Sequence, residues 1–92
     1  MNYSASEAYH DKCRRFDKKR ISRSNIRTRW FRNFYVLYQS KGYFTHNTFP
    51  FKLDDVDLNY PGTYYGPFWT LTEATEFADA VKQTHENFIL GG

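Results

Sequence analysis

Cationic side chains concentrate in the first part of this 92-residue chain, where their spacing suits binding to phosphate groups. Residues 1–41 contain eleven Lys and Arg against three acidic residues, a net charge of +8, whereas residues 42–92 contain two against seven, a net charge of −5. Such asymmetry between two halves points to a charged partner. The candidate binding residues are Arg14, Arg15, Lys18, Lys19, Arg20, Arg23, Arg27, Arg29 and Arg32. For the cations that follow Lys19, solvated charge on a linker is the alternative interpretation.

Arginines interleaved with aromatic residues can combine phosphate neutralisation with stacking on nucleic-acid bases. The run Arg29-Trp30-Phe31-Arg32 has this pattern. The same rings also suit a hydrophobic core, so we interpret most of them as core residues. The cations, which cannot be core, carry the binding signal.

Histidine, cysteine and carboxylate residues form no recognisable catalytic or metal site. His10 and Cys13 are three residues apart, but a structural zinc site usually has a second close pair, and His46 and His85 are distant. The acidic run 54–59 lacks the glycine and the bidentate glutamate of a calcium loop. Neither an activated Cys–His dyad nor a glycine-rich phosphate loop can be identified. We therefore expect a non-enzymatic protein with no catalytic residue, no metal and no cofactor.

Aromatic residues are unusually frequent, with 19 in the chain, or 21%. This exceeds what the core of one small domain, residues 1–92, needs. We expect several rings at the surface, where they suit recognition or, for tyrosine, simply tolerate solvent. The lone Cys13 excludes an internal disulfide and suits a cytoplasmic setting, and the N-terminus lacks the basic and apolar regions of a signal peptide. No apolar run approaches the ~20 residues of a membrane span.

The element that positions the others is the run of aromatic and β-branched residues Trp30–Tyr38. It is apolar on both alternating faces, which is typical of a central strand covered on both sides. Ser40–Gly42 predicts a turn, and Tyr43–Thr48 the return strand of a hairpin. Phe49–Phe51 is expected to end that strand, because Pro50 cannot donate to a ladder. Tyr64–Trp69 is the expected third strand.

Two helices are expected to flank these strands. Capping boxes predict one helix from Ser4 to about Lys19 and another from Thr70 to about Asn87. The second helix has an apolar stripe with Phe77 and Val81 expected to face the sheet; the stripe comprises Leu71, Ala74, Phe77, Ala78, Val81, His85 and Phe88. Residues 20–28 are expected to form a basic loop, and the first helix to cover the other sheet face or an edge. The predicted fold class is α+β: a small three-stranded antiparallel sheet with an N-terminal basic helix and a C-terminal amphipathic acidic helix.

In its overall profile the chain resembles the small phage-encoded inhibitors of bacterial immunity called anti-CRISPR proteins. The shared features are short length, one α+β domain, few cysteines and strong charge polarity. The basic opening from Met1 through Arg14-Arg15-Phe16-Asp17-Lys18-Lys19-Arg20 is most similar to inhibitors of type I-F surveillance complexes. Such proteins share no motif, so no residue role is carried over. The resemblance implies a non-enzymatic inhibitor in the host bacterial cytoplasm that docks on a complex of Cas proteins and guide RNA and blocks target DNA.

Many anti-CRISPR proteins are acidic DNA mimics, whereas the basic region here favours contact with guide RNA or with an acidic protein surface. Two other classes stay open. A free-standing nucleic-acid-binding regulator would bind naked duplex, although strands separate the two helices and no helix-turn-helix pair can be drawn. A purely protein-binding subunit would use its aromatic surface and ignore nucleic acid. We expect a monomer with no membrane association.

Overall fold

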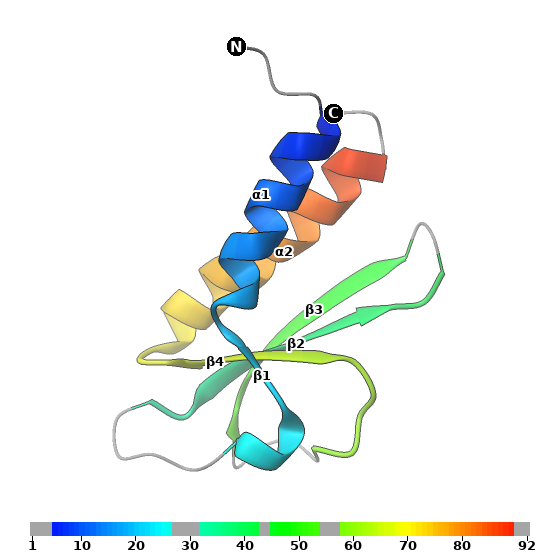
Figure 1. Ribbon diagram of the computed structural model, residues 1–92. Helices are drawn as coiled ribbons and strands as arrows, with labels where there is room; N and C mark the ends of the chain where they lie inside the picture. Colours follow the sequence, from blue (N-terminus) through cyan, green and yellow to red (C-terminus); the bar gives the residue numbers. More distant parts are fainter. Residues whose placement is uncertain (1–4, 27–31, 43–44, 54–57, 90–92) are drawn as a thin grey trace.

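A four-stranded antiparallel sheet carries both helices on one side (Figure 1). The computed structural model describes residues 5–26, 32–42, 45–53 and 58–89. The elements are α1 (Ala5–Asp17), β1 (Arg20–Ile21), the 3-10 turn η1 (Arg23–Asn25), β2 (Phe34–Ser40), β3 (His46–Lys52), β4 (Thr63–Phe68) and α2 (Leu71–Ile89). The strand order is β1-β4-β2-β3. The α+β class and the terminal helices are confirmed.

The predicted number of strands was wrong, because residues expected in a loop form β1. This strand has only two residues, and it pairs with β4 through Arg20↔Tyr65 and Ile21↔Tyr64. The Gly66 amide donates to the Lys19 carbonyl at 2.8 Å and extends the contact. Ile21 packs against a buried cluster on the sheet, so one apolar side chain and the backbone of β4 fix the segment.

The central hairpin is confirmed, with both strands displaced toward the C-terminus. β2 lies between β4 and β3, and Tyr35, Val36 and Leu37 are buried in succession, as a strand covered on both faces requires. Residues 30 and 31 lie outside the described part of the chain, as do 43 and 44 of the return strand. The expectation that Phe49–Phe51 ends β3 was wrong, since β3 continues to Lys52. β3 is the edge strand of the sheet, a position where Pro50 is tolerated.

The two sheet faces have separate cores. Toward the helices, Val36, Tyr65 and Phe68 pack with Ala74 and Ala78 of α2. On the opposite face Tyr35, Leu37, Phe51 and Tyr64 pack with Ile26, and the partly buried Ile21, Leu53 and Leu58 join them. Short irregular segments therefore cover the second face, where an additional layer of regular structure would otherwise be expected.

Helix α2 begins at the predicted capping box. The Glu73 amide donates to Thr70 Oγ1 at 3.1 Å, while the Glu73 carboxylate accepts from the Trp69 amide at 3.1 Å. Ala74, Ala78 and Val81 of the predicted stripe are buried, and the Phe77 ring contacts those of Tyr65 and Phe68 on the sheet. The stripe was wrong at its ends: Leu71 is 52% exposed and Phe88 37% exposed, while Thr84 is buried.

Helix α1 packs on α2 and lies on the same side of the sheet, which corrects the expected position on the other face or at an edge (Figure 1). The Tyr9 ring stacks on Phe88 with centroids 4.1 Å apart, and the Phe16 ring meets Phe77 at 5.4 Å. These pairings make the two helices antiparallel. The helix ends at Asp17, two residues before the expected end, and Ser4 lies outside the described residues. Neither described helix is long and apolar enough to cross a membrane.

Candidate functional site

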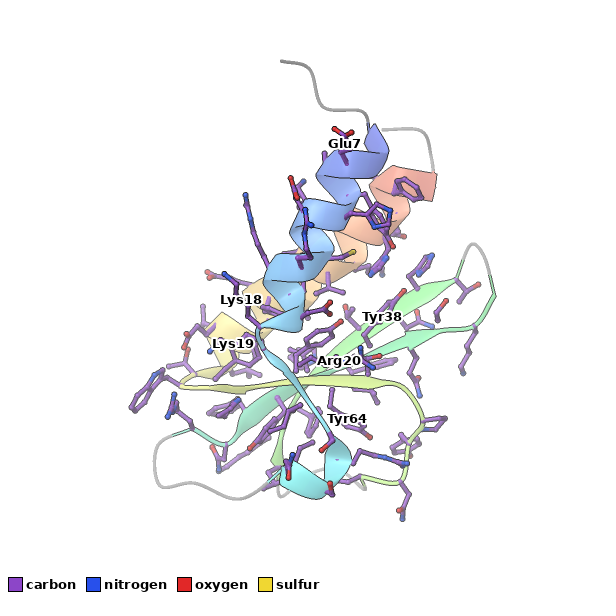
Figure 2. All side chains as sticks on the ribbon, viewed as in Figure 1. Glu7, Lys18, Lys19, Arg20, Tyr38 and Tyr64 are labelled. Atoms are coloured by element: carbon purple, nitrogen blue, oxygen red, sulfur yellow. The ribbon has the colours of Figure 1, made fainter. Side chains whose placement is uncertain are left out.

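The C-terminal end of α1 and the residues that follow it form an exposed basic surface. Arg14, Arg15, Lys18, Lys19 and Arg20 are all exposed. Figure 2 shows Lys18, Lys19 and Arg20 where the chain leaves α1 and crosses to the sheet. Because an α-helix turns about 100° per residue, Arg14 and Lys18 lie opposite Phe16, whereas Arg15 lies on the flank beside it. These predicted cations therefore all lie at the surface, but Arg15 is on a different side of the helix from Arg14 and Lys18.

Few of these cations are neutralised within the described residues. The Arg14 guanidinium forms an ion pair and hydrogen bond with Asp11, three residues earlier on the same helix. Arg15, Lys18 and Arg20 have no carboxylate within salt-bridge distance in that part of the structure. Exposed pairs such as Arg14–Asp11 contribute only about 0–1 kcal/mol, so even Arg14 can be drawn to another anion at small cost.

Lys19 of this surface and one further predicted cation, Arg32, lie against aromatic rings at one end of β4. The Lys19 ammonium is 5.4 Å from the Phe68 ring centroid, and the Arg32 guanidinium is 5.0 Å from that of Trp69. The structure thus brings Arg32 near the end of β4 that also carries the Lys19 contact, although the two are well separated in sequence. Cation–π contacts of this kind are worth about 0.5–1 kcal/mol at exposed sites. They hold the two side chains in place while their charges stay accessible.

Arg23 does not belong to this surface. It lies on η1, where it donates to the Leu58 carbonyl at 3.3 Å and so fastens the turn to the loop before β4. Arg27 and Arg29 are outside the described residues, as are Trp30 and Phe31, so the predicted interleaving of cations and rings there is not described.

A stack of tyrosine and histidine rings lies between the helices and the sheet, and sequence reasoning did not predict it. The Tyr38 ring stacks on His85 at 4.7 Å and on His46 at 5.9 Å, and the two imidazoles are 5.3 Å apart. Tyr38 hydroxyl and His46 Nδ1 are 2.6 Å apart, and Tyr9 hydroxyl and His85 Nδ1 are 2.7 Å apart. Burial, and then the neighbouring His46, lower the pKa of His85.

This ring stack has the electrostatics of a packed core rather than of a reactive site. Burial and the hydrogen bond to Cys13 raise the pKa of Tyr9 to about 12. Burial also raises the pKa of the Cys13 thiol, whereas a nucleophilic cysteine needs a lowered one. Within the described residues no group of three His, Cys, Asp or Glu could hold a metal ion.

Exposed aromatic rings gather on the sheet face away from the helices. Phe49 is 47% exposed and Tyr60 55% exposed. With Leu37, Gln39 and Phe51 they line an apolar hollow of about 330 Å³. Gln39 donates to the Pro61 carbonyl at 2.8 Å and fixes one wall. The prediction that several rings lie at the surface is confirmed.

Comparison of the chain with protein-family models, curated proteins and solved structures found no match in any of the three. The arguments about function consequently rest on the side chains themselves.

Proposed function

We propose that this protein is a non-enzymatic, stoichiometric binding protein that contacts phosphates of a nucleic acid held within a protein complex. The observation that carries the proposal is the exposed group of cations at the C-terminal end of α1: Arg14, Arg15, Lys18, Lys19 and Arg20. Only Arg14 has an ion pair within the described residues. Exposed basic side chains, most of them without an acidic partner, suit phosphate binding, which is driven largely by counterion release.

The anti-CRISPR resemblance gives the proposal its specific form. The protein docks on a type I ribonucleoprotein surveillance complex near the guide RNA and blocks binding of target DNA. A ribonucleoprotein offers an anionic backbone and a protein surface. The basic surface at the end of α1 suits the first, and the apolar hollow with Phe49 and Tyr60 suits the second.

The proposal is tested by comparing two variants that each lose three positive charges, one within the basic surface and one outside it. The test variant carries Arg14→Gln, Arg15→Gln and Lys18→Gln; Lys19 is spared because it contacts Phe68. Glutamine is chosen because a carboxylate near a helix C-terminus would itself destabilise the helix. The control variant carries glutamine at three exposed lysines outside the basic surface, Lys41, Lys52 and Lys82, and has the same net charge.

Affinity for the reconstituted surveillance complex is measured at several salt concentrations. We expect the test variant to bind more weakly, and the slope of log affinity against log salt to fall by about 0.7 for each lost contact to a single strand. The control variant should retain the wild-type slope. Equal losses in both variants would refute a localised site. If the wild-type protein bound naked duplex as tightly as it binds the surveillance complex, a free-standing regulator would be favoured. If removal of the guide RNA left binding unchanged, a purely protein-binding subunit would be favoured.

A further inference from the structure

A groove with a mixed polar and apolar lining runs between the two helices. It has a volume of about 290 Å³ and is lined by Lys12, Arg15, Phe16, Ala80, Gln83, Thr84 and Asn87. The α1 residues supply two cations, and the α2 residues supply two side-chain amides and a hydroxyl. We propose that this groove is a specific phosphate-binding subsite within the basic surface.

Helical spacing explains why these groups converge. Lys12 and Arg15 are three residues apart and share one side of α1, and Gln83 and Asn87 are four apart and share one side of α2. The helices are held against each other by the Phe16–Phe77 and Tyr9–Phe88 ring contacts. Two rows of donors therefore face one hollow from opposite walls, with Phe16 and Ala80 contributing its apolar lining.

Charge complementarity identifies the occupant as an anion. Neither Lys12 nor Arg15 has an ion pair within the described residues, because Asp11 contacts Arg14. On α2, Glu76 lies four residues before Ala80, and Asp79 and Glu86 lie four before and three after Gln83, so acidic residues flank this wall and the two cations of α1 supply the attraction for an anion. The anion is thus expected between the Lys12 and Arg15 side chains of α1 and the Gln83 and Asn87 amides of α2.

The donor set favours phosphate over carboxylate. Phosphate oxygens in nucleic-acid complexes accept from Arg and Lys and also from Ser, Thr, Asn and Gln side chains. A phosphate presents its oxygens tetrahedrally and can accept from both walls at once, whereas a carboxylate presents two oxygens in one plane. Carboxamides that bear no charge also add selectivity that cations alone lack. That the phosphate comes from a nucleic-acid backbone rests on the proposed function. A free nucleotide would offer the same phosphate chemistry.

Side-chain amide resonances of Gln83 and Asn87 test the subsite directly. The folded protein is titrated in separate experiments with oligouridylate, uridine monophosphate, polyglutamate and sodium chloride. We expect oligouridylate to shift the Gln83 and Asn87 side-chain signals, while those of Gln39 and Asn25, outside the groove, stay in place. Shifts with uridine monophosphate of the same size at the same phosphate concentration would assign the subsite to a free nucleotide and overturn the backbone source. Equal shifts with polyglutamate would overturn phosphate selectivity.

A variant that preserves net charge separates this subsite from the basic surface as a whole. Gln83→Ala with Asn87→Ala should weaken oligouridylate binding about tenfold or more, the value expected for lost hydrogen bonds to a charged group. Thr72→Ala with Thr75→Ala, at exposed positions of α2 outside the groove, is the control and should bind as wild type does.

The two proposals fail in different ways. If oligouridylate shifts backbone signals at the end of α1 while Gln83 and Asn87 stay unmoved, the subsite is wrong and nucleic-acid binding stands. If uridine monophosphate shifts the two amides but neither oligouridylate nor the surveillance complex binds, the phosphate chemistry stands and the proposed function is refuted. Loss of binding in the Thr72 and Thr75 control equal to that in the test variant would overturn the subsite.

Discussion

Replacement of Gly66 by alanine should destabilise the protein severely, because two independent costs coincide there. Gly66 has φ +146, a conformation that residues with a Cβ rarely adopt. A Cβ would also lie 2.5 Å from Tyr35 Cδ1 and 3.2 Å from the Phe34 carbonyl oxygen. Tyr35 is completely buried at the centre of the sheet and has no free space to move into.

The magnitude follows from adding the two costs. An unfavourable positive φ costs about 1–2 kcal/mol, and overpacking a core costs about 1–3 kcal/mol more. The sum of about 2–5 kcal/mol is a large part of the roughly 5–15 kcal/mol that stabilises a typical domain. For a domain of this size the melting temperature should fall by at least about 8 °C.

Urea unfolding followed by tyrosine and tryptophan fluorescence measures the loss. Gly42→Ala is the control, because Gly42 also has a positive φ, +98, but nothing lies within 4 Å of its Cβ position. It should cost only the backbone part. Equal unfolding midpoints for the two variants would refute the close packing of Tyr35 against β4, and with it the alignment of β2 and β4.

Three further predictions concern α2 and the ring stack. Phe77→Ala should cost about 3 kcal/mol in urea unfolding, since its partly buried ring contacts three others; an unchanged midpoint would refute that packing. Thr70→Ala should lower the free energy of unfolding by about 1 kcal/mol, because the helix loses its cap, whereas Thr70→Ser keeps a capping hydroxyl and should lose little. The pKa of His85 is lower in the folded protein than in the unfolded chain, so the unfolded chain binds a proton at this residue more readily. The melting temperature should therefore be highest above about pH 6.5 and should fall as the pH is lowered below that value. This acid-side fall should shrink in His85→Gln but not in His10→Gln.

Elements with a strong local pattern were predictable, and elements fixed by distant partners were not. The doubly apolar run that became β2 and the Thr70–Glu73 capping box each contain their own signal. β1 has no such signal, because two residues with one apolar side chain suffice only when β4 is already in place. In the same way, Pro50 predicts a strand end unless the strand lies at a sheet edge, and the edge is a property of the whole topology.

The candidate site shows the same division. Arg14 and Arg15 are close together because adjacent residues of one helix carry them, as the sequence alone indicates. Arg23 was grouped with them by sequence but belongs to the opposite side of the sheet, whereas Arg32 reaches the end of β4 through Trp69. His46 and His85 looked unrelated because nothing near either residue indicates that strand and helix bring their rings within 5.3 Å.

The basic N-terminal part and the acidic C-terminal part of the sequence do not lie at opposite ends of the structure. The cations at and just beyond the C-terminal end of α1 lie beside the acidic α2, which runs antiparallel to α1, so positive and negative surfaces adjoin there. Exposed Glu73, Glu76 and Asp79 on α2 oppose a polyanion that crosses both helices near the end of α1. A nucleic-acid strand is therefore expected to follow the outer flank of α1 and to reach α2 only at the Gln83 and Asn87 amides. The acidic residues thereby restrict how the strand can approach, and Glu76→Gln should strengthen oligouridylate binding by removing one of the negative charges beside the groove.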